Sequence, residues 1–363
     1  DIRGPKEFDA SFVEMVNQES DGLLIGGAVT LNGRAHLMNT GMRFNLPLEL
    51  WSRITKPIVF YGITYRVWPY QIYYNQAQLK KTMEYVLSDS NIIFSVRNDG
   101  TKAWLERFLG YTSDKIVCIP DPGLYVTCDH GAWHPQITKD KVNVIVSLNN
   151  EDEIYRFGGK WRETFWKYVR SFSREEYLAG LWYYMPGWRK RKKEFLQQLV
   201  QALELISKQV DTNIILCPHS LDDYKIMSEF MSHCPLRLAH QRVVSSGLLQ
   251  APLAPYFYGL YANADLALSM RVHSMSPAIA LGTPVIVLSS QARTKEFMKA
   301  AGMEKYVLDV FDNDLAAKLY GLMKYCMDHR ENVKASLRQA LSTMREQTFT
   351  FNKQVYSFIK AKK

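Results

Sequence analysis

The chain has 363 residues, of which 47% are hydrophobic and 22% charged, and it carries a formal net charge of +9 at pH 7. Its length exceeds the size at which a single hydrophobic core stops growing, about 250–300 residues, so two domains are expected. Low-complexity stretches are nearly absent, which argues against a disordered, arginine-rich binder. The positive charge favours an anionic partner, such as a phosphorylated substrate, an acidic membrane surface or nucleic acid.

The sequence predicts a cytoplasmic protein without a metal site. No apolar stretch approaches the roughly 18–20 residues that span a bilayer. The first twenty residues are polar and acidic rather than a basic stretch followed by an apolar one, so secretion is not indicated. The five cysteines are scattered and lack the close spacing of a zinc site.

The first part of the chain alternates short β-branched apolar runs with helical patterns. The runs that predict buried strands are residues 21–27, 56–62, 91–97 and 115–120. Helical patterns lie at about 73–87 and 100–109, and Gly110 is suited to end the second helix. This alternation predicts a parallel sheet that helices cover on both faces.

A new alternating series begins after residues 121–140, which are rich in Pro, Gly, His and Trp. Its predicted strands are residues 142–148, 213–218, 264–269, 284–288 and 306–310, and its best helix covers about 192–208. The predicted fold is therefore α/β, with two doubly wound, Rossmann-like domains at 1–138 and 139–330 whose sheets face a shared cleft. Residues 331–363 are predicted to form a C-terminal helix that packs across both domains as a strap.

The most informative stretch places Arg271 and His273 between a predicted strand and a predicted helix. If the chain is extended there, residues i and i+2 point the same way. Ser274 or Ser276 is expected to cap the helix, with Pro277 in its first turn, so that free N–H groups face the same ligand. We expect an anion site with a titratable group beside it. The alternative is a structural histidine beside an ordinary surface arginine.

Three further residues follow strands in the same way. Arg97 ends one strand and begins a helix, so it is expected to project into the cleft from the first domain; the alternative is a salt bridge to Asp99 or Glu106. His219 and Asp222 follow the strand at 213–218 and are candidates for contact with an acceptor. A structural His219 and a capping role for the nearby serine are equally consistent with this pattern.

Residues 182–193, from Trp182 to Lys193, combine large aromatic side chains with five consecutive cations. Such a run is usually the solvated start of a helix. Beside aromatic residues it is also suited to a lipid headgroup surface, where each basic residue contributes roughly 1 kcal/mol.

Several of these stretches resemble, in order, the motifs of the polysaccharide pyruvyl transferases. The matching stretches are 95–97 (SVR), 119–122 (IPDP), 264–274 (ADLALSMRVHS), 282–286 (GTPVI) and Lys295. Gly26 and Gly27 resemble the family's glycine-rich loop after an early strand and are candidates for a substrate loop. The resemblance covers about residues 21–310. The strand and Asn/Gly-Asp loop with which family members usually open is not found before Asp21, so we expect a first domain that is incomplete here or rebuilt on its acceptor side.

The resemblance implies a two-domain GT-B architecture and transfer of pyruvate from phosphoenolpyruvate onto sugar hydroxyls as a ketal, without a metal or cofactor. It assigns His273 the role of general acid. It assigns Arg97 and Arg271 to the donor anion, with Lys295 assisting and Ser274 at the same site. The implied acceptor is a cell-surface glycan or its lipid-linked precursor. Peripheral contact with the inner face of the membrane through residues 182–193 suits such an acceptor.

Two other functions are consistent with parts of the sequence. A GT-B glycosyltransferase with a nucleotide-sugar donor needs an acidic residue for the ribose. After the strand at 284–288, however, Gln291, Arg293 and Lys295 come before the first acid, Glu296. This favours a smaller and more anionic donor. A non-catalytic nucleic-acid-binding protein needs cations and aromatic residues in a recognisable module, and none is found, so no nucleic-acid partner is expected.

Overall fold

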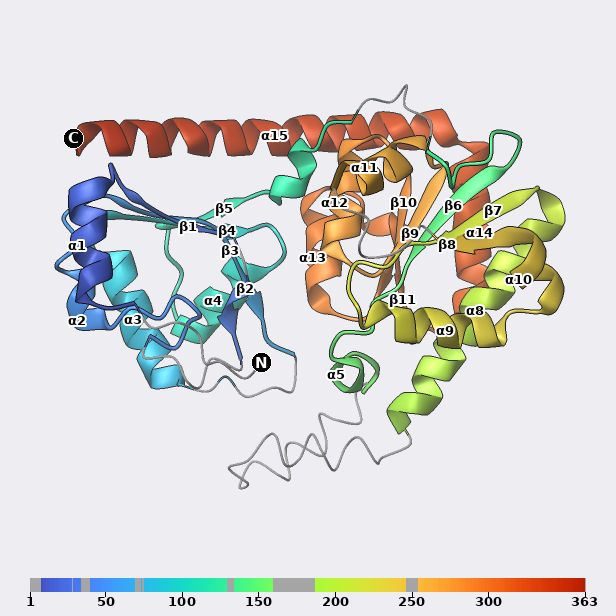
Figure 1. Cartoon of the computed structure of the whole chain (residues 1–363), viewed down its shortest axis with the longest axis horizontal. Helices are drawn as coiled ribbons and strands as arrows, with labels where there is room; N and C mark the ends of the chain where they lie inside the picture. The colour runs from blue at the N-terminus through green and yellow to red at the C-terminus, as the bar shows by residue number, and fades with distance from the viewer. Residues whose placement is uncertain are drawn as a thin grey trace. The chain divides into compact units, whose positions relative to one another are not determined.

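The computed structural model describes residues 8–27, 29–33, 40–68, 73, 75–128, 134–158, 187–245 and 254–362 (Figure 1). The chain divides into two compact units, unit 1 (Asp1–Asp121 with Met344–Lys363) and unit 2 (Pro122–Thr343). Residues 122–138, which the sequence places in the first domain, belong to unit 2. There the 3₁₀ helix η2 (Pro122–Tyr125) packs against α12 (Val272–Ala280).

Unit 1 is built on a five-stranded parallel sheet. The strands β1 (Leu23–Gly26), β3 (Ile58–Arg66), β4 (Ile92–Arg97) and β5 (Ile116–Ile119) are neighbours in this order, and β2 (Val29–Asn32) also pairs with β3. The four predicted strands are therefore confirmed. Strand β2 was not predicted because it is short and follows β1 almost directly; it uses the end of β3, from Thr64 onward, that β1 leaves unpaired.

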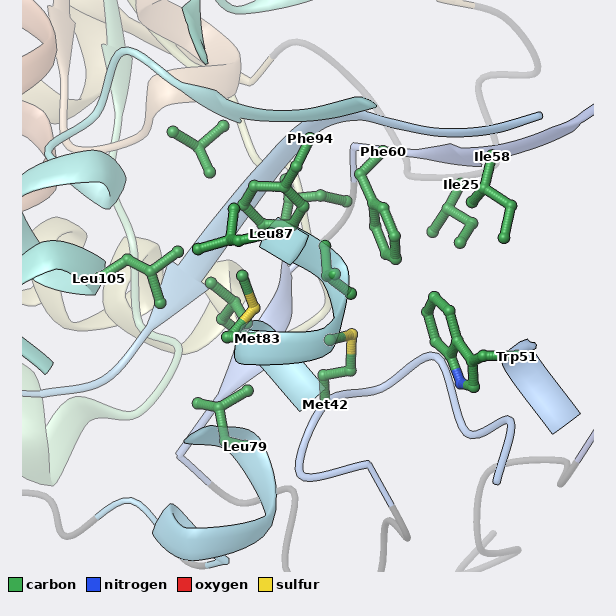
Figure 2. Packing of buried hydrophobic residues seen from close by; sticks show 14 of the residues in the cluster. Ile25, Met42, Trp51, Ile58, Phe60, Leu79, Met83, Leu87, Phe94 and Leu105 are labelled. Atoms are coloured by element: carbon green, nitrogen blue, oxygen red, sulfur yellow. The ribbon is translucent and has the colours of Figure 1, made fainter. Parts of the chain in front are cut away.

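One face of this sheet is covered by helices whose apolar stripes supply the core. Helix α3 (Gln76–Ser88) turns Leu79, Met83 and Leu87, spaced four residues apart, towards the sheet, as Figure 2 shows. Phe60 packs on Trp51 with ring centroids 5.7 Å apart. The other helices of unit 1 that precede β5 are α1 (Ala10–Glu19), α2 (Leu48–Trp51) and α4 (Thr101–Leu109).

The opposite face of the sheet receives the end of the last helix, α15 (Arg330–Ala361). Side chains alternate along a strand, so Tyr61 points away from the face that Phe60 occupies. The Tyr61 ring lies 5.6 Å from that of Phe351 on α15, and its hydroxyl bonds Asn352 at 2.7 Å. The predicted C-terminal helix is confirmed. Its residues up to Thr343 belong to unit 2 and those from Met344 to unit 1.

Unit 2 contains a six-stranded parallel sheet with helices on both faces (Figure 1). Its strands, in spatial order, are β11 (Val307–Asp309), β10 (Val285–Ser289), β9 (Leu266–Ser269), β6 (Val142–Ser147), β7 (Thr212–Leu216) and β8 (Val243–Ser245). Among the described residues its helices, besides η2 and the start of α15, are α5 (Glu153–Phe157), α8 (Gly187–Gln209), α9 (Asp223–His233), α10 (Leu236–Arg242), α11 (Ala254–Asn263), α12, α13 (Ala292–Ala300), η3 (Glu304–Tyr306) and α14 (Leu315–Asp328). All five strands predicted here are confirmed; only the three-residue edge strand β8 was missed.

The parallel register brings three loops to one edge of this sheet. Ser147 at the end of β6 pairs with Ser269 at the end of β9, and Val146 pairs with Leu216 at the end of β7. The residues that follow these three strands therefore meet at the carboxyl edge, where ligands bind in folds of this kind. Among the described residues, no helix is both long enough and apolar enough to cross a membrane.

Candidate functional site

Helix α12 begins earlier than predicted. Arg271 is extended, with φ of −125°, and Val272 is the first helical residue. The Ser274 hydroxyl is buried against Ser269 and bonds the Arg271 carbonyl at 3.0 Å, whereas Ser276 bonds the carbonyl of Val272. The prediction that Ser274 or Ser276 caps the helix is wrong, because both lie inside it and bond carbonyls of its first turn. The N-cap residue is Arg271, and its side chain makes no capping hydrogen bond.

The Arg271 guanidinium is buried and bound by groups from two other strand ends. Its Nη2 donates to Asp223 Oδ1 at 2.6 Å and to Ser220 Oγ at 2.9 Å, and its Nη1 lies 3.1 Å from Glu151 Oε1. The side chain is only 9% exposed. Its Nε is buried and has no hydrogen-bond partner among the described residues. Arg271 is thus fixed at the carboxyl edge and retains one donor to bind a further group.

Asp223 holds this arrangement together, and sequence reasoning missed it. Its carboxylate is fully buried and accepts the backbone N–H of His219 at 2.9 Å and that of Ser220 at 3.0 Å, in addition to Arg271. The predicted Asp222 is instead 54% exposed and pairs with a lysine on its own helix. Helix α9 begins between the two aspartates, so the second one turns inward. The signal in the sequence was a pair of adjacent aspartates, which does not say which one is buried.

His219 and His273 lie at the same cluster. His219 Nε2 is 2.9 Å from the Tyr261 hydroxyl. The pKa of His219 is lowered to about 4, mainly by burial and also by the positive charges of Arg271 and His273, against the opposing effect of Asp223. His219 is therefore neutral at pH 7. His273, on the first turn of α12, has an exposed side chain. The structure thus brings Arg271, His273 and His219 together at one edge of the sheet, and a role for them in binding or catalysis stays a prediction.

In unit 1, Arg97 is tied to the loop after β1. Its Nη2 donates to the Gly27 carbonyl at 2.6 Å, and its Nη1 lies 2.8 Å from Asp121 Oδ2, just after β5. The side chain is 3% exposed. The alternative prediction of a salt bridge to Asp99 or Glu106 is wrong. Asp99 accepts from two threonine hydroxyls, and Glu106 pairs with a lysine on its own helix. The sequence missed Asp121 as the partner because the pair joins two neighbouring strands.

The two candidate loop glycines differ in their surroundings. A Cβ on Gly27 would lie 2.6 Å from the carbonyl oxygen of Gly62 and 3.2 Å from Arg97 Nη2, whereas a Cβ on Gly26 would meet nothing within 4 Å. Gly27 is therefore required by close backbone approach. Gly26 is not required in this way.

Lys295 lies apart from the Arg271 cluster. It is exposed on α13 and pairs with Asp309 at the end of β11, at 2.7 Å. Strand β11 is two strands away from β9 in the sheet. A role for Lys295 at the donor stays a prediction.

The basic aromatic segment is only partly available for contact. Residues 182–186 lie outside the described residues. Arg191 donates to the carbonyl of Phe157 at 2.7 Å, and Lys192 is 2% exposed between Glu153 at 2.9 Å and Glu229 at 2.7 Å. The expectation of five solvent- or lipid-facing cations is wrong for these two, because the start of α8 packs on α5 and α9. The other three cations of the run are exposed.

The comparisons with known proteins identify the family. The family model for polysaccharide pyruvyl transferase matches residues 3–291. The chain belongs to the polysaccharide pyruvyl transferase family. The match contains Gly27, Arg97, Asp223, Arg271 and His273, whereas α15 lies beyond it. A search of curated proteins finds no match. Across the described residues, no group of three or more His, Cys, Asp or Glu side chains is arranged to hold a metal ion.

Solved structures with similar folds are GT-B enzymes, which confirms the predicted architecture. A trehalose-6-phosphate synthase, OtsA, has a TM-score of 0.53 at 10% identity, covering 96% of this chain and 75% of that one. The N-terminal domain of Candida albicans trehalose-6-phosphate phosphatase has a TM-score of 0.52 at 13% identity, covering 96% and 74%. A trehalose-6-phosphate protein from E. coli, bound with UDP-2-fluoro glucose, has a TM-score of 0.52 at 9% identity. The match covers 96% of this chain and 76% of that one.

Proposed function

We propose that the protein transfers pyruvate from phosphoenolpyruvate to two hydroxyls of a glycan, forming a ketal. The observation that carries this proposal is the start of α12, where a buried Arg271 with an unused donor stands two residues from an exposed His273. A fixed cation beside a titratable group suits a donor that carries a carboxylate and a phosphate and that must be protonated on carbon. Membership of the family supports the same assignment.

In this proposal an anionic group of the donor takes the place of Glu151 on the Arg271 guanidinium. Glu151 is 31% exposed and binds Nη1 without filling the remaining Nε, so it is the partner that can leave. Asp223 and Ser220 stay in place and hold the guanidinium plane. Arg97 acts through Gly27, because its Nη2 donates to the Gly27 carbonyl while Asp121 holds its Nη1.

His273 then serves as the general acid. It protonates the methylene carbon of the donor, which becomes a methyl group and leaves an oxocarbenium-like centre at the adjacent carbon. One sugar hydroxyl attacks that carbon and returns a proton to His273. Inorganic phosphate leaves with its bridging oxygen. The second hydroxyl closes the ketal, and its proton goes to the departing phosphate.

The acceptor is proposed to be a cell-surface glycan or its lipid-linked precursor. Neutral His219 lies beside Arg271, and the buried Tyr261 hydroxyl holds its Nε2. The imidazole can exchange hydrogen bonds with uncharged sugar hydroxyls. A peripheral membrane contact in the cytoplasm would rely on Arg189, Lys190 and Lys193, the exposed cations of the basic run.

A nucleotide-sugar donor is the second candidate, because one structure of similar fold is bound with UDP-2-fluoro glucose. A thermal-shift comparison of phosphoenolpyruvate with UDP-glucose separates the two donors. A ligand at 100 times its Kd stabilises a protein by about 2.7 kcal/mol. We expect phosphoenolpyruvate to raise the Tm of the unmodified protein and of Lys225→Gln, an exposed control on α9, by more than inorganic phosphate does. Arg271→Gln should lose this excess. Stabilisation by UDP-glucose alone would reverse the choice.

A further inference from the structure

Unit 2 contains a cavity of about 470 Å³ on the edge of its sheet opposite the Arg271 cluster. Residues 262–264, which line it, precede β9, and residues 281–283, which also line it, precede β10. Arg271 follows the other end of β9. The four residues of that strand, at about 3.3 Å each, separate the two places by roughly 13 Å. The cavity is therefore distinct from the candidate active site.

The remaining wall of the cavity is the first part of α15. Arg330, Lys334 and Arg338 are four residues apart, so they share one face of the helix, and all three line the cavity. Within the described part of the chain, two acids lie within 4 Å of these cations. They are Asp265, which is 2.7 Å from Arg330, and Glu331, which is near Lys334 and Arg338. Three positive groups thus face two negative ones.

Glu331 forms only long ion pairs with Lys334 and Arg338. It lies 3.9 Å from Lys334 and 3.8 Å from Arg338, beyond hydrogen-bonding distance, and its side chain is 78% exposed. Exposed pairs of this kind contribute about 0–1 kcal/mol. Arg330 Nε is buried and has no hydrogen-bond partner among the described residues. The wall therefore offers donors that the chain itself does not use fully.

Two helices end at the cavity, and exposed helix carbonyls would repel an anion. Here several of those carbonyls are occupied. After α12, Gly282 with φ of +78° donates to the Ile279 carbonyl, and Thr283 donates to that of Ala278, which is a Schellman motif. At the end of α11, the Tyr261 carbonyl accepts from Ala264 N and from the Thr283 hydroxyl. The cations of α15 therefore dominate the electrostatics of the cavity.

We propose that this cavity binds a small phosphorylated ligand, with Arg330, Lys334 and Arg338 as the anion-binding residues. The volume lies within the range of about 300–1,000 Å³ typical of small-molecule sites. A phosphate group matches the geometry better than a single carboxylate, because its several oxygens can accept from two or three cations at once. The occupant displaces Glu331 and supplies the acceptor that Arg330 Nε lacks.

The test adds inorganic phosphate and measures amide hydrogen exchange peptide by peptide. Protection of α15 is thereby distinguished from protection caused by phosphate at Arg271. We expect phosphate to slow exchange in the peptide covering residues 330–343 in the unmodified protein. The double variant Lys334→Gln with Arg338→Gln should raise the midpoint, which is the phosphate concentration that gives half of this protection, about tenfold or more. Lys324→Gln, an exposed control on α14, should leave the midpoint unchanged. Equal midpoints in the double variant and the unmodified protein would overturn the proposal.

A second pair of variants tests the displacement of Glu331. Glu331→Gln removes the carboxylate that competes with phosphate. It should lower the phosphate concentration that gives half-maximal protection several-fold. Glu346→Gln changes the net charge equally but lies fifteen residues along α15, about 22 Å away and beyond the Debye length of about 8 Å. The proposal fails if both variants tighten binding alike, since that would indicate a general charge effect, or if acetate protects the peptide as well as phosphate does.

Discussion

Replacing Asp223 by Asn tests whether one buried carboxylate holds the candidate site together. Asp223 accepts hydrogen bonds from the Arg271 guanidinium and from backbone N–H groups, including those of His219 and Ser220. The carboxamide keeps the size of the side chain. It loses the charge, however, and turns an NH₂ group towards at least one of these donors.

The expected loss is large because both partners are buried, with Arg271 9% exposed and Asp223 fully buried. Removing one partner of a buried ion pair costs about 3–5 kcal/mol. For a unit of this size, each kcal/mol shifts Tm by about 2–4 °C. We therefore expect Asp223→Asn to lower the Tm of unit 2 by roughly 6 °C or more, measured by calorimetry, and to weaken binding of phosphoenolpyruvate.

The neighbouring Asp222 provides a matched control, because the same substitution there removes only an exposed pair with Lys225. Asp222→Asn should change the free energy of unfolding by no more than about 0.5 kcal/mol. If Asp223→Asn changes it by less than about 1 kcal/mol, or if the two variants behave alike, Asp223 does not have the positioning role assigned to it.

Three further outcomes are expected. His273→Gln should lower turnover about 10²–10⁴-fold with a much smaller change in donor affinity, measured by steady-state kinetics and by direct binding; near-normal turnover would end the general-acid role. Gly27→Ala should destabilise unit 1 by about 1–3 kcal/mol in urea unfolding, because its Cβ would lie 2.6 Å from the Gly62 carbonyl, whereas Gly26→Ala should be nearly neutral. His219 has a folded pKa of about 4, below its ordinary value of 6.5, so the unfolded chain binds its proton first and stability falls as pH decreases through this range. His219→Gln should flatten that fall, and an unchanged slope between pH 6.5 and 4 would contradict the buried neutral imidazole.

The strands and the position of Arg271 and His273 after one of them could be predicted from the sequence because they depend on local patterns. Buried parallel strands are short β-branched runs, and nine of the eleven strands in the described part of the chain were found in this way. Of the two that were missed, β2 follows β1 almost directly and so has no turn signal of its own before it, and β8 has only three residues. Arg271 and His273 were placed correctly because they follow such a run directly.

The partners of these residues could not be predicted because they depend on packing between distant segments. Asp121 pairs with Arg97 only because β4 and β5 are neighbours in the sheet. Whether Asp222 or Asp223 turns inward depends on the residue at which α9 begins. Lys192 belongs to a run of cations that the sequence indicates is solvated, yet the packing of α8 on α5 and α9 buries it between two glutamates.

Mass analysis of the product tests the proposed reaction most directly. The protein is incubated with phosphoenolpyruvate and a panel of glycosides that carry neighbouring hydroxyls, and in parallel with UDP-glucose and the same panel. We predict that one glycoside gains the mass of pyruvic acid less one water, with release of one inorganic phosphate, and that His273→Gln forms this product far more slowly. A product that gains a hexose from UDP-glucose, with none formed from phosphoenolpyruvate, would contradict the proposed reaction.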